Sequence, residues 1–269
     1  MPHDFDTAIA LTALDKGRFT GATHSAYANM VGPYGGITSA TLLQAVMLHP
    51  DRLGSPVALT VNFAGPIADG PFEISARASR TNRSTQHWSL ELSQQGVIAT
   101  TATAVFAVRR PSWSSVEAVA HNDLPPPSQV PPSDLSARLP WTRRYEMRFV
   151  DGAFPEPLDG IEQPKALARV WLRDSPPRPL DFPSLAGLCD AFFPRVFSRR
   201  RLFSPAGTVT LTAYFHADEA MLAAQGDRYV LGVARGLAYH QGFHDQSAEI
   251  WGDNGRLLAT THQMVYFRD

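Results

Sequence analysis

The sequence is poor in several features, and each shortage argues against a class of protein. It contains one cysteine, Cys189, so no intrachain disulfide can form, which fits a reducing compartment. No stretch of 18 consecutive apolar residues occurs, and the first residues show no basic segment followed by an apolar run. We therefore expect a cytoplasmic protein without membrane insertion. The formal net charge is −1, which gives no reason to expect nucleic acid as a partner.

Short motifs of several enzyme classes are also missing. The sequence has no Gly-x-Ser-x-Gly elbow of a serine hydrolase, no dinucleotide fingerprint and no phosphate-binding loop. His240 and His244 are four residues apart, as two zinc ligands on one helix would be. However, Gly242 lies between them, their neighbours are typical of strands, and no third ligand is evident. We therefore expect neither a metal site nor a resident cofactor.

The sequence does contain an internal repeat. Residues 98–101 read Ile-Ala-Thr-Thr and residues 258–261 read Leu-Ala-Thr-Thr, and each copy is followed, after three more residues, by valine and an aromatic residue. Each copy also follows a short polar turn, Gln-Gln-Gly in the first and Asp-Asn-Gly in the second. Two β-hairpins of the same design therefore close two halves of the chain. In this alignment Thr103 corresponds to Gln263.

The pattern of apolar residues agrees with two halves. A chain of 269 residues suits two domains of about 130 residues. In the first half, helical spacing predicts a helix, and alternating segments predict four strands after it; the helix covers residues 37–48 and the strands 57–63, 72–80, 88–93 and 97–108. In the second half we predict strands at 145–150 and 166–172, a helix at 184–193, and strands at 208–215, 229–239, 245–251 and 257–267.

A proline-rich segment separates the two halves. Residues 111–140 contain repeated prolines and little apolar periodicity, which is typical of a linker. The segments on either side, residues 1–110 and 141–269, each combine one long apolar helix with an antiparallel sheet. We therefore predict the α+β class and a double hotdog fold, in which each of two tandem units wraps a sheet around a helix.

Three polar residues in the second half could carry chemistry. Asp190 lies among leucine and phenylalanine in the predicted helix, and burial there would raise its pKa towards the range of a general base. Thr208 alternates with other threonines along a strand, and Gln263 lies in an apolar terminal strand. The side-chain amide of Gln263 could orient a water molecule or a carbonyl group. The competing interpretation is that all three side chains face solvent, as they would on an amphipathic helix and half-exposed strands.

Several blocks of the sequence resemble the acyl-CoA thioesterase II family, the TesB-like double-hotdog hydrolases, over nearly the whole chain. Tyr34-Gly35-Gly36 before the first helix resembles an aromatic-Gly-Gly opening, and residues 80–84, Arg-Thr-Asn-Arg-Ser, resemble an Arg-x-Gly-Arg-Ser turn with Asn82 in place of glycine. In the second half, the family's Asp, Thr and Gln positions are occupied by Asp190, Thr208 and Gln263. The sequence departs from the family at two further places, with Ile37 where glutamine is usual and Thr210-Leu211 where Asp-His is usual.

The resemblance implies hydrolysis of acyl-CoA thioesters, with coenzyme A entering only as part of the substrate. Asp190 would take the proton of a water held by Thr208 and Gln263, and backbone N–H groups at the start of either helix (Gly35-Gly36 or Ser184) would stabilise the oxyanion. It also implies a substrate-binding set, which comprises Tyr34, Gly35, Gly36, Arg80, Arg83 and Ser84.

The sequence leaves several alternatives open. Asp190 could attack the thioester itself through a mixed anhydride. A hotdog enoyl-CoA hydratase or dehydratase, or a non-catalytic acyl-CoA-binding protein, could have the same fold. The run Arg199-Arg200-Arg201 could bind the phosphates of coenzyme A or form an ordinary solvated loop. A homodimer of the whole chain also stays open.

Overall fold

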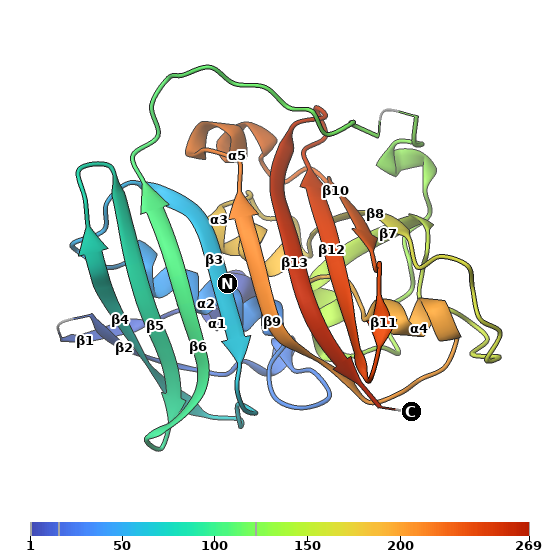
Figure 1. Cartoon of the computed structure of the whole chain (residues 1–269), viewed down its shortest axis with the longest axis horizontal. Coiled ribbons are helices and arrows are strands. Elements are labelled where there is room, and N and C mark those ends of the chain that lie inside the picture. Colours follow the sequence, from blue (N-terminus) through green and yellow to red (C-terminus); the bar gives the residue numbers. More distant parts are fainter. Residues whose placement is uncertain (1, 16, 122, 269) are drawn as a thin grey trace.

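The strands of the protein form one continuous antiparallel sheet, seen across the whole of Figure 1. This computed structural model describes residues 2–15, 17–121 and 123–268. Twelve of the strands lie along the sheet in the order β1-β2-β4-β5-β6-β3-β9-β13-β12-β10-β8-β7, and β11 pairs with β12 at its edge. All strand pairs are antiparallel, and the helices occupy one side of the sheet, so the α+β prediction is confirmed.

Each half of the chain supplies one half of the sheet. The elements of the first half are α1 (Asp4–Ala8), β1 (Thr12–Asp15), β2 (Arg18–Ala22), η1 (Ser25–Tyr27), α2 (Gly35–Met47), β3 (Ser55–Phe63), β4 (Pro71–Thr81), β5 (Thr85–Gln94) and β6 (Val97–Ala107). Those that follow are η2 (Pro127–Gln129), η3 (Pro140–Arg144), β7 (Tyr145–Asp151), β8 (Ala168–Asp174), α3 (Phe182–Leu188), α4 (Arg195–Arg200), β9 (Ala206–Phe215), α5 (Glu219–Gln225), β10 (Val230–Arg235), β11 (Tyr239–His240), β12 (Phe243–Trp251) and β13 (Leu257–Phe267).

The two halves join between β3 and β9, where the pairing is symmetric. Thr60 pairs with Thr212, and their hydroxyl oxygens are 3.0 Å apart. Ala58 pairs with Tyr214 on one side of this point, and Asn62 pairs with Thr210 on the other. A local twofold axis therefore passes between the two threonines and relates one repeat to the other.

The helices α2 and α3 pack against each other on one face of the sheet, near this axis (Figure 1). Helix α2 is built from small and apolar residues and is buried on nearly every side, as expected of a helix without a polar face. Helix α3 starts at the N-cap Asp181, whose carboxylate accepts a hydrogen bond from the Ser184 backbone. No helix in the described part of the chain is long and apolar enough to cross a bilayer.

The predicted second helix is wrong in its length. It ends at Leu188 rather than 193, and Asp190 lies in the turn that follows it. The backbone N–H groups of Asp190 and Ala191 bond to the carbonyls three residues earlier, as in a tight final turn. Pro194, which lacks an N–H and disfavours helical geometry at Phe193, prevents the helix from continuing through 193. Helix α4 then begins as a separate element.

The proline-rich segment lies mostly on the second repeat. Its described residues 111–121 and 123–126 form no helix or strand, whereas Val130 is buried with Trp171 and Trp251 of that repeat. The indole N–H of Trp171 donates to the carbonyl oxygen of Pro125, and Arg148 donates to the Pro127 and Val130 carbonyls. The domain boundaries at 110 and 140 stay a prediction. Residues at the end of this segment line the cavity described in the next section.

Candidate active site

The structure brings Asp190, Thr208 and Gln263 together in one hydrogen-bonded chain. The Gln263 side-chain amide donates from Nε2 to Asp190 Oδ1 over 2.9 Å. The Thr208 hydroxyl donates to Gln263 Oε1 over 3.1 Å. The two ends of a single amide thus fix the carboxylate on one side and the hydroxyl on the other. This geometry argues against the solvent-facing interpretation of these side chains, and both Asp190 and Gln263 are buried.

Three different elements position these groups. Asp190 follows α3, Gln263 lies on an inward-facing position of β13, and Thr208 lies near the start of β9. The register between β9 and β13 shifts at Val209, which is left unpaired between Thr208 and Thr210. A bulge of this kind redirects the side chains next to it, and here it places the Thr208 hydroxyl against the amide of Gln263.

Burial raises the pKa of Asp190 to about 7 from its ordinary value of 3.8, because the charged form loses its solvation. Two hydrogen bonds that favour the carboxylate, from the Gln263 amide and from the Gly36 backbone N–H, partly oppose this shift. The outcome is a carboxyl group that exchanges its proton near neutral pH, which is the range suited to a general base.

The Gly35-Gly36 pair allows the first repeat to reach this carboxylate. A side-chain carbon at Gly35 would lie 2.7 Å from Asp190 Oδ2, and one at Gly36 would collide with the Tyr34 ring. The two glycines therefore let the start of α2 approach the acid of the other repeat closely. The positive end of a helix favours a nearby anion, so α2 helps to hold the Asp190 carboxylate.

The two predicted oxyanion donors are not free. The Gly36 N–H is already bonded to Asp190, and the Ser184 N–H is bonded to Asp181 Oδ1 over 2.8 Å. The expectation is therefore not supported for the Gly36 and Ser184 amides, and for the Gly35 amide it stays a prediction. The physical reason is the same in both cases, since a carboxylate already caps the start of each helix.

Tyr34 joins the two repeats beside the acid. Its hydroxyl donates to the carbonyl oxygen of Gly187 over 2.7 Å, which ties the start of α2 to the end of α3. Its ring stacks on Trp141, with ring centroids 4.2 Å apart and planes within 4° of parallel. Tyr34 is thus both a wall of the site and a support for the turn that carries Asp190.

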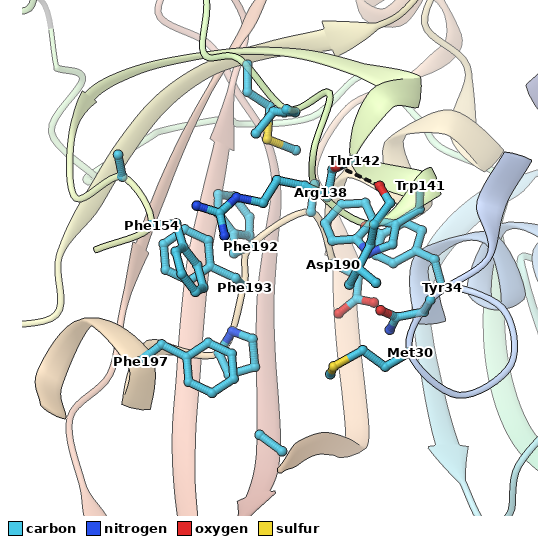
Figure 2. A pocket seen from close by; sticks show the side chains of 18 of the residues that line it. Met30, Tyr34, Arg138, Trp141, Thr142, Phe154, Asp190, Phe192, Phe193 and Phe197 are labelled. Carbon is cyan, nitrogen blue, oxygen red and sulfur yellow. Dashed lines mark hydrogen bonds between the residues drawn. The ribbon is translucent and has the colours of Figure 1, made fainter. Parts of the chain in front are cut away.

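A cavity of about 670 Å³ opens next to the three polar groups, and all three line it. Figure 2 shows Asp190 beside Tyr34 and Met30, with aromatic side chains over the rest of the cavity. Asn29 also lines the cavity from the first repeat. The aromatic lining consists of Tyr34, Trp141, Phe149, Phe154, Phe192, Phe193, Phe197 and Phe203. A mainly apolar cavity of this size with a few convergent polar groups is typical of a small-molecule site.

Sequence reasoning missed two residues that hold the wall of this cavity. Gln246 Nε2 donates to the Phe192 carbonyl over 3.2 Å, and its Oε1 accepts from the Arg195 backbone N–H over 3.1 Å. The fully buried Arg195 guanidinium donates twice to the Phe193 carbonyl, and its Cζ lies 4.1 Å from the centre of the Phe193 ring. Gln246 could have been noticed as a second amide in a strand that pairs with Gln263; nothing in the sequence marked Arg195.

Other predicted binding residues lie outside this cavity. Arg80 is the penultimate residue of β4 and donates to Asn82 in the turn before β5, where Arg83 and Ser84 also lie. None of these three substrate-binding candidates is among the cavity's lining residues. Arg199 to Arg201 do not line it either, and Arg201 pairs with Asp159 over 2.8 Å. These assignments stay predictions without geometric support from the cavity.

The alignment of Thr103 with Gln263 is wrong by one residue. Thr103 pairs with Thr60, whereas the residue that pairs with the equivalent Thr212 is His262. The structural counterpart of Gln263 is therefore Ala104. A one-residue slip along a strand moves a side chain to the opposite face: Thr103 is exposed, while Ala104 and Gln263 are buried. The stretch from Gln246 to Gln263 is one residue longer than the equivalent stretch from Trp88 to Ala104, so an alignment without gaps is shifted by one residue on β13.

Comparison with known families supports both halves of the fold. A model described as the acyl-CoA thioesterase C-terminal domain matches residues 118–267, and one described as the acyl-CoA thioesterase N-terminal domain matches residues 24–107. A search of curated proteins gave no match.

Solved structures agree with the same architecture. A hotdog-fold protein of unknown function from Alicyclobacillus acidocaldarius is 49% identical, with 100% of this chain and 99% of that chain covered and a TM-score of 0.94. The TesB protein of Mycobacterium avium subsp. paratuberculosis is 18% identical, with 99% of each chain covered and a TM-score of 0.77. The acyl-CoA thioesterase II of Mycobacterium marinum is 17% identical, with 98% of each chain covered and a TM-score of 0.75. The last two similarities show the fold alone. Together, the two family matches and the three structures confirm the double hotdog fold.

Proposed function

The chain belongs to the acyl-CoA thioesterase family, and on that premise we propose that it hydrolyses acyl-CoA to a carboxylic acid and free coenzyme A. The single observation that supports this most is the chain of hydrogen bonds from Thr208 through Gln263 to Asp190 at the wall of an apolar cavity. A thioester carbonyl is already electrophilic, so hydrolysis needs a positioned and deprotonated water more than a strong protein nucleophile.

Asp190 is the general base in this proposal. Its pKa of about 7 leaves a substantial fraction ionised at neutral pH, ready to take a proton from water. Thr208 donates its own hydrogen to Gln263, so its oxygen has only lone pairs to offer. A water that gives one hydrogen to Asp190 and the other to Thr208 keeps a lone pair free to attack the thioester carbon.

Gln263 acts as a positioning residue rather than as a direct ligand of the water. Its nitrogen holds Asp190 and its oxygen holds Thr208, so it sets the distance between the two acceptors. Its donation to Asp190 also lowers the pKa of that carboxyl, which keeps the base ionised at lower pH.

The oxyanion requires a hydrogen-bond donor other than the Gly36 and Ser184 amides. Asn29 lines the cavity, and its side-chain amide makes no hydrogen bond with the described part of the chain. We assign it as the candidate donor to the developing oxyanion. The first repeat would then supply the donor and the second repeat the base.

Release of free thiol from a panel of acyl-CoA substrates tests the proposal. We expect turnover by the unmodified chain, and we expect Asn29→Ala to lower kcat by about 10²-fold, the lower end of the range for loss of one oxyanion donor. An absorbance assay of water addition to enoyl-CoA measures the rival hydratase activity. Binding of acyl-CoA with neither activity would instead support a non-catalytic binding protein and overturn the proposed function.

A further inference from the structure

The cavity that contains Asp190 also contains a positive charge. Arg138 lines it, and Figure 2 shows the Arg138 side chain extending towards Phe154 and away from Asp190. Arg138 comes from the proline-rich segment between the two repeats. It is a charged donor in a cavity that is otherwise lined mainly by aromatic groups.

Arg138 rests on an aromatic surface that it shares with the rest of the cavity. Its Cζ lies 4.4 Å from the centre of the Phe154 ring, and that ring packs edge-on against Phe193 with centroids 5.2 Å apart. Stacking on a ring uses the flat face of a guanidinium and leaves its N–H groups at the edge available. The ring therefore holds the group in place and leaves the N–H donors at its edge facing away from the ring, where an anion can reach them.

In this structure the donors of Arg138 meet Glu156. The two side chains form an ion pair, and Glu156 is the one carboxylate that pairs with Arg138 in the described ranges of the chain. Both residues line the cavity, yet the Glu156 side chain is 71% exposed and the Arg138 side chain 35%. An exposed ion pair of this kind contributes little to stability, so another anion can replace Glu156 at low cost.

We propose that Arg138 is the anion-recognition group for the substrate, and that Glu156 occupies it until an anionic group of the substrate takes its place. The inference rests on the proposed thioesterase function for the identity of the ligand as a thioester. Two parts of such a ligand carry the required charge: the phosphates of coenzyme A, and a carboxylate at the far end of the acyl group. Either would accept charge-assisted hydrogen bonds from the guanidinium edge.

Calorimetric titration of the full chain tests this proposal. An Asp190→Asn background is used so that thioester ligands survive during the titration. The probes are coenzyme A alone, a pantetheine thioester of a neutral acyl group, and a pantetheine thioester whose acyl group ends in a carboxylate. Arg138→Gln and Glu156→Gln are compared with Arg143→Gln, a matched control that lies five residues after Arg138 in η3, is exposed and does not line the cavity.

The two substitutions should act in opposite directions on anionic ligands. Arg138→Gln should weaken binding about tenfold, as expected for a lost charge-assisted hydrogen bond, and Glu156→Gln should tighten it about two- to fivefold by removing the competitor. Arg143→Gln should leave it unchanged, and the neutral pantetheine thioester should bind all variants alike. An effect with coenzyme A identifies its phosphates as the source, and an effect with the carboxylated thioester identifies the acyl group.

The contrary results are equally clear. The proposal fails if Arg138→Gln changes neither anionic ligand by more than twofold, if it weakens the neutral ligand equally, or if no anionic ligand binds. These titrations do not depend on turnover. A protein that binds coenzyme A through Arg138 but hydrolyses no thioester would therefore disprove the proposed function and leave this inference standing.

Discussion

The two repeats share a backbone plan, but one pair of equivalent sheet positions is polar in the second repeat and mainly apolar in the first. In the second repeat, β12 and β13 bring Gln246 opposite Gln263. The register places Trp88 opposite Ala104 at the matching point of the first repeat, and both are buried. Each repeat also has a bulged valine, Val57 or Val209, at the equivalent position of β3 or β9.

The residues beside this bulge differ between the two repeats. Next to it, the second repeat has Thr208, whereas the first has Pro56, which has no hydroxyl to offer. Helix α2 contains no acidic residue, while the turn after α3 supplies Asp190. In the first repeat, the buried Trp88 indole occupies the position that corresponds to the Gln246 amide of the second repeat. We therefore infer one hydrolytic site per chain, with the first repeat acting as a support and a wall.

The largest expected effect follows from removing the acid that only the second repeat has. Asp190→Asn keeps the size of the side chain and one acceptor oxygen for the Gln263 amide, but it cannot accept a proton from water. We expect kcat for thiol release to fall by about 10²–10⁴-fold, with the circular dichroism spectrum unchanged. Activity within threefold of the parent would mean that the asymmetry between the repeats does not reflect catalysis.

The next prediction gives the second repeat the residue of the first. Gln263→Ala removes the amide that orients Asp190 and Thr208, and we expect kcat/KM to fall by roughly 10- to 100-fold, less than for loss of the base itself. Thr103→Ala is the matched control, because Thr103 is the residue that aligns with Gln263 when the two repeats are compared by sequence alone. Since Thr103 is exposed on the other face, we expect no change; equal losses in both variants would restore the alignment that the register contradicts.

Stability should also depend on pH through this buried acid. Its pKa of about 7 in the folded state exceeds that of an unfolded aspartate, so the folded chain binds the proton more tightly. The contribution to stability is therefore complete below about pH 4 and is lost as pH rises through 7. Asp190→Asn should remove a slope of up to about 1.4 kcal/mol per pH unit in that window, measured as the free energy of urea unfolding at several pH values. Parallel curves for parent and variant would argue against a buried, proton-binding Asp190.

The smallest expected effect concerns the cavity wall. Gln246→Ala leaves the Phe192 carbonyl and the Arg195 N–H without their partner, which costs about 1–3 kcal/mol of unfolding free energy. Because Phe192 and Phe193 line the cavity, we expect KM to rise severalfold while kcat changes little. A kcat loss as large as that of Gln263→Ala would move Gln246 from the wall into the group that positions the water.

Much of the fold could be predicted from the sequence because repetition and periodicity are local signals. The helix at 37–48 and the strand at 97–108 match α2 and β6 closely, since apolar spacing alone defines them. The helix at 184–193 was overextended because apolar content continues through Phe193, while its end depends on Pro194 and on contacts of Asp190 with another repeat. The repeat alignment paired Thr103 with Gln263 incorrectly, because sequence identity alone does not define the register of a strand with its neighbours.

The candidate site was predicted in part. The family resemblance selected Asp190, Thr208 and Gln263 from residues that individually carried little information, and the structure brings them into contact. What the sequence could not reveal depends on distant segments meeting: the Gly36 N–H bonded to Asp190, the Gln246 support and the presence of Arg138 in the cavity. None of these has a signature in the spacing of residues along the chain.

The pH dependence of kcat/KM for thiol release tests the central claim most directly, because it measures the ionisation of the base in the free enzyme. We predict a rise with pH through a single ionisation near 7, since Asp190 must lose its proton to act. In Gln263→Ala that midpoint should move upward, because the donor that favours the carboxylate is gone. A rate that is flat between pH 5 and 9, or a midpoint near 4 that Gln263→Ala leaves in place, would contradict the account.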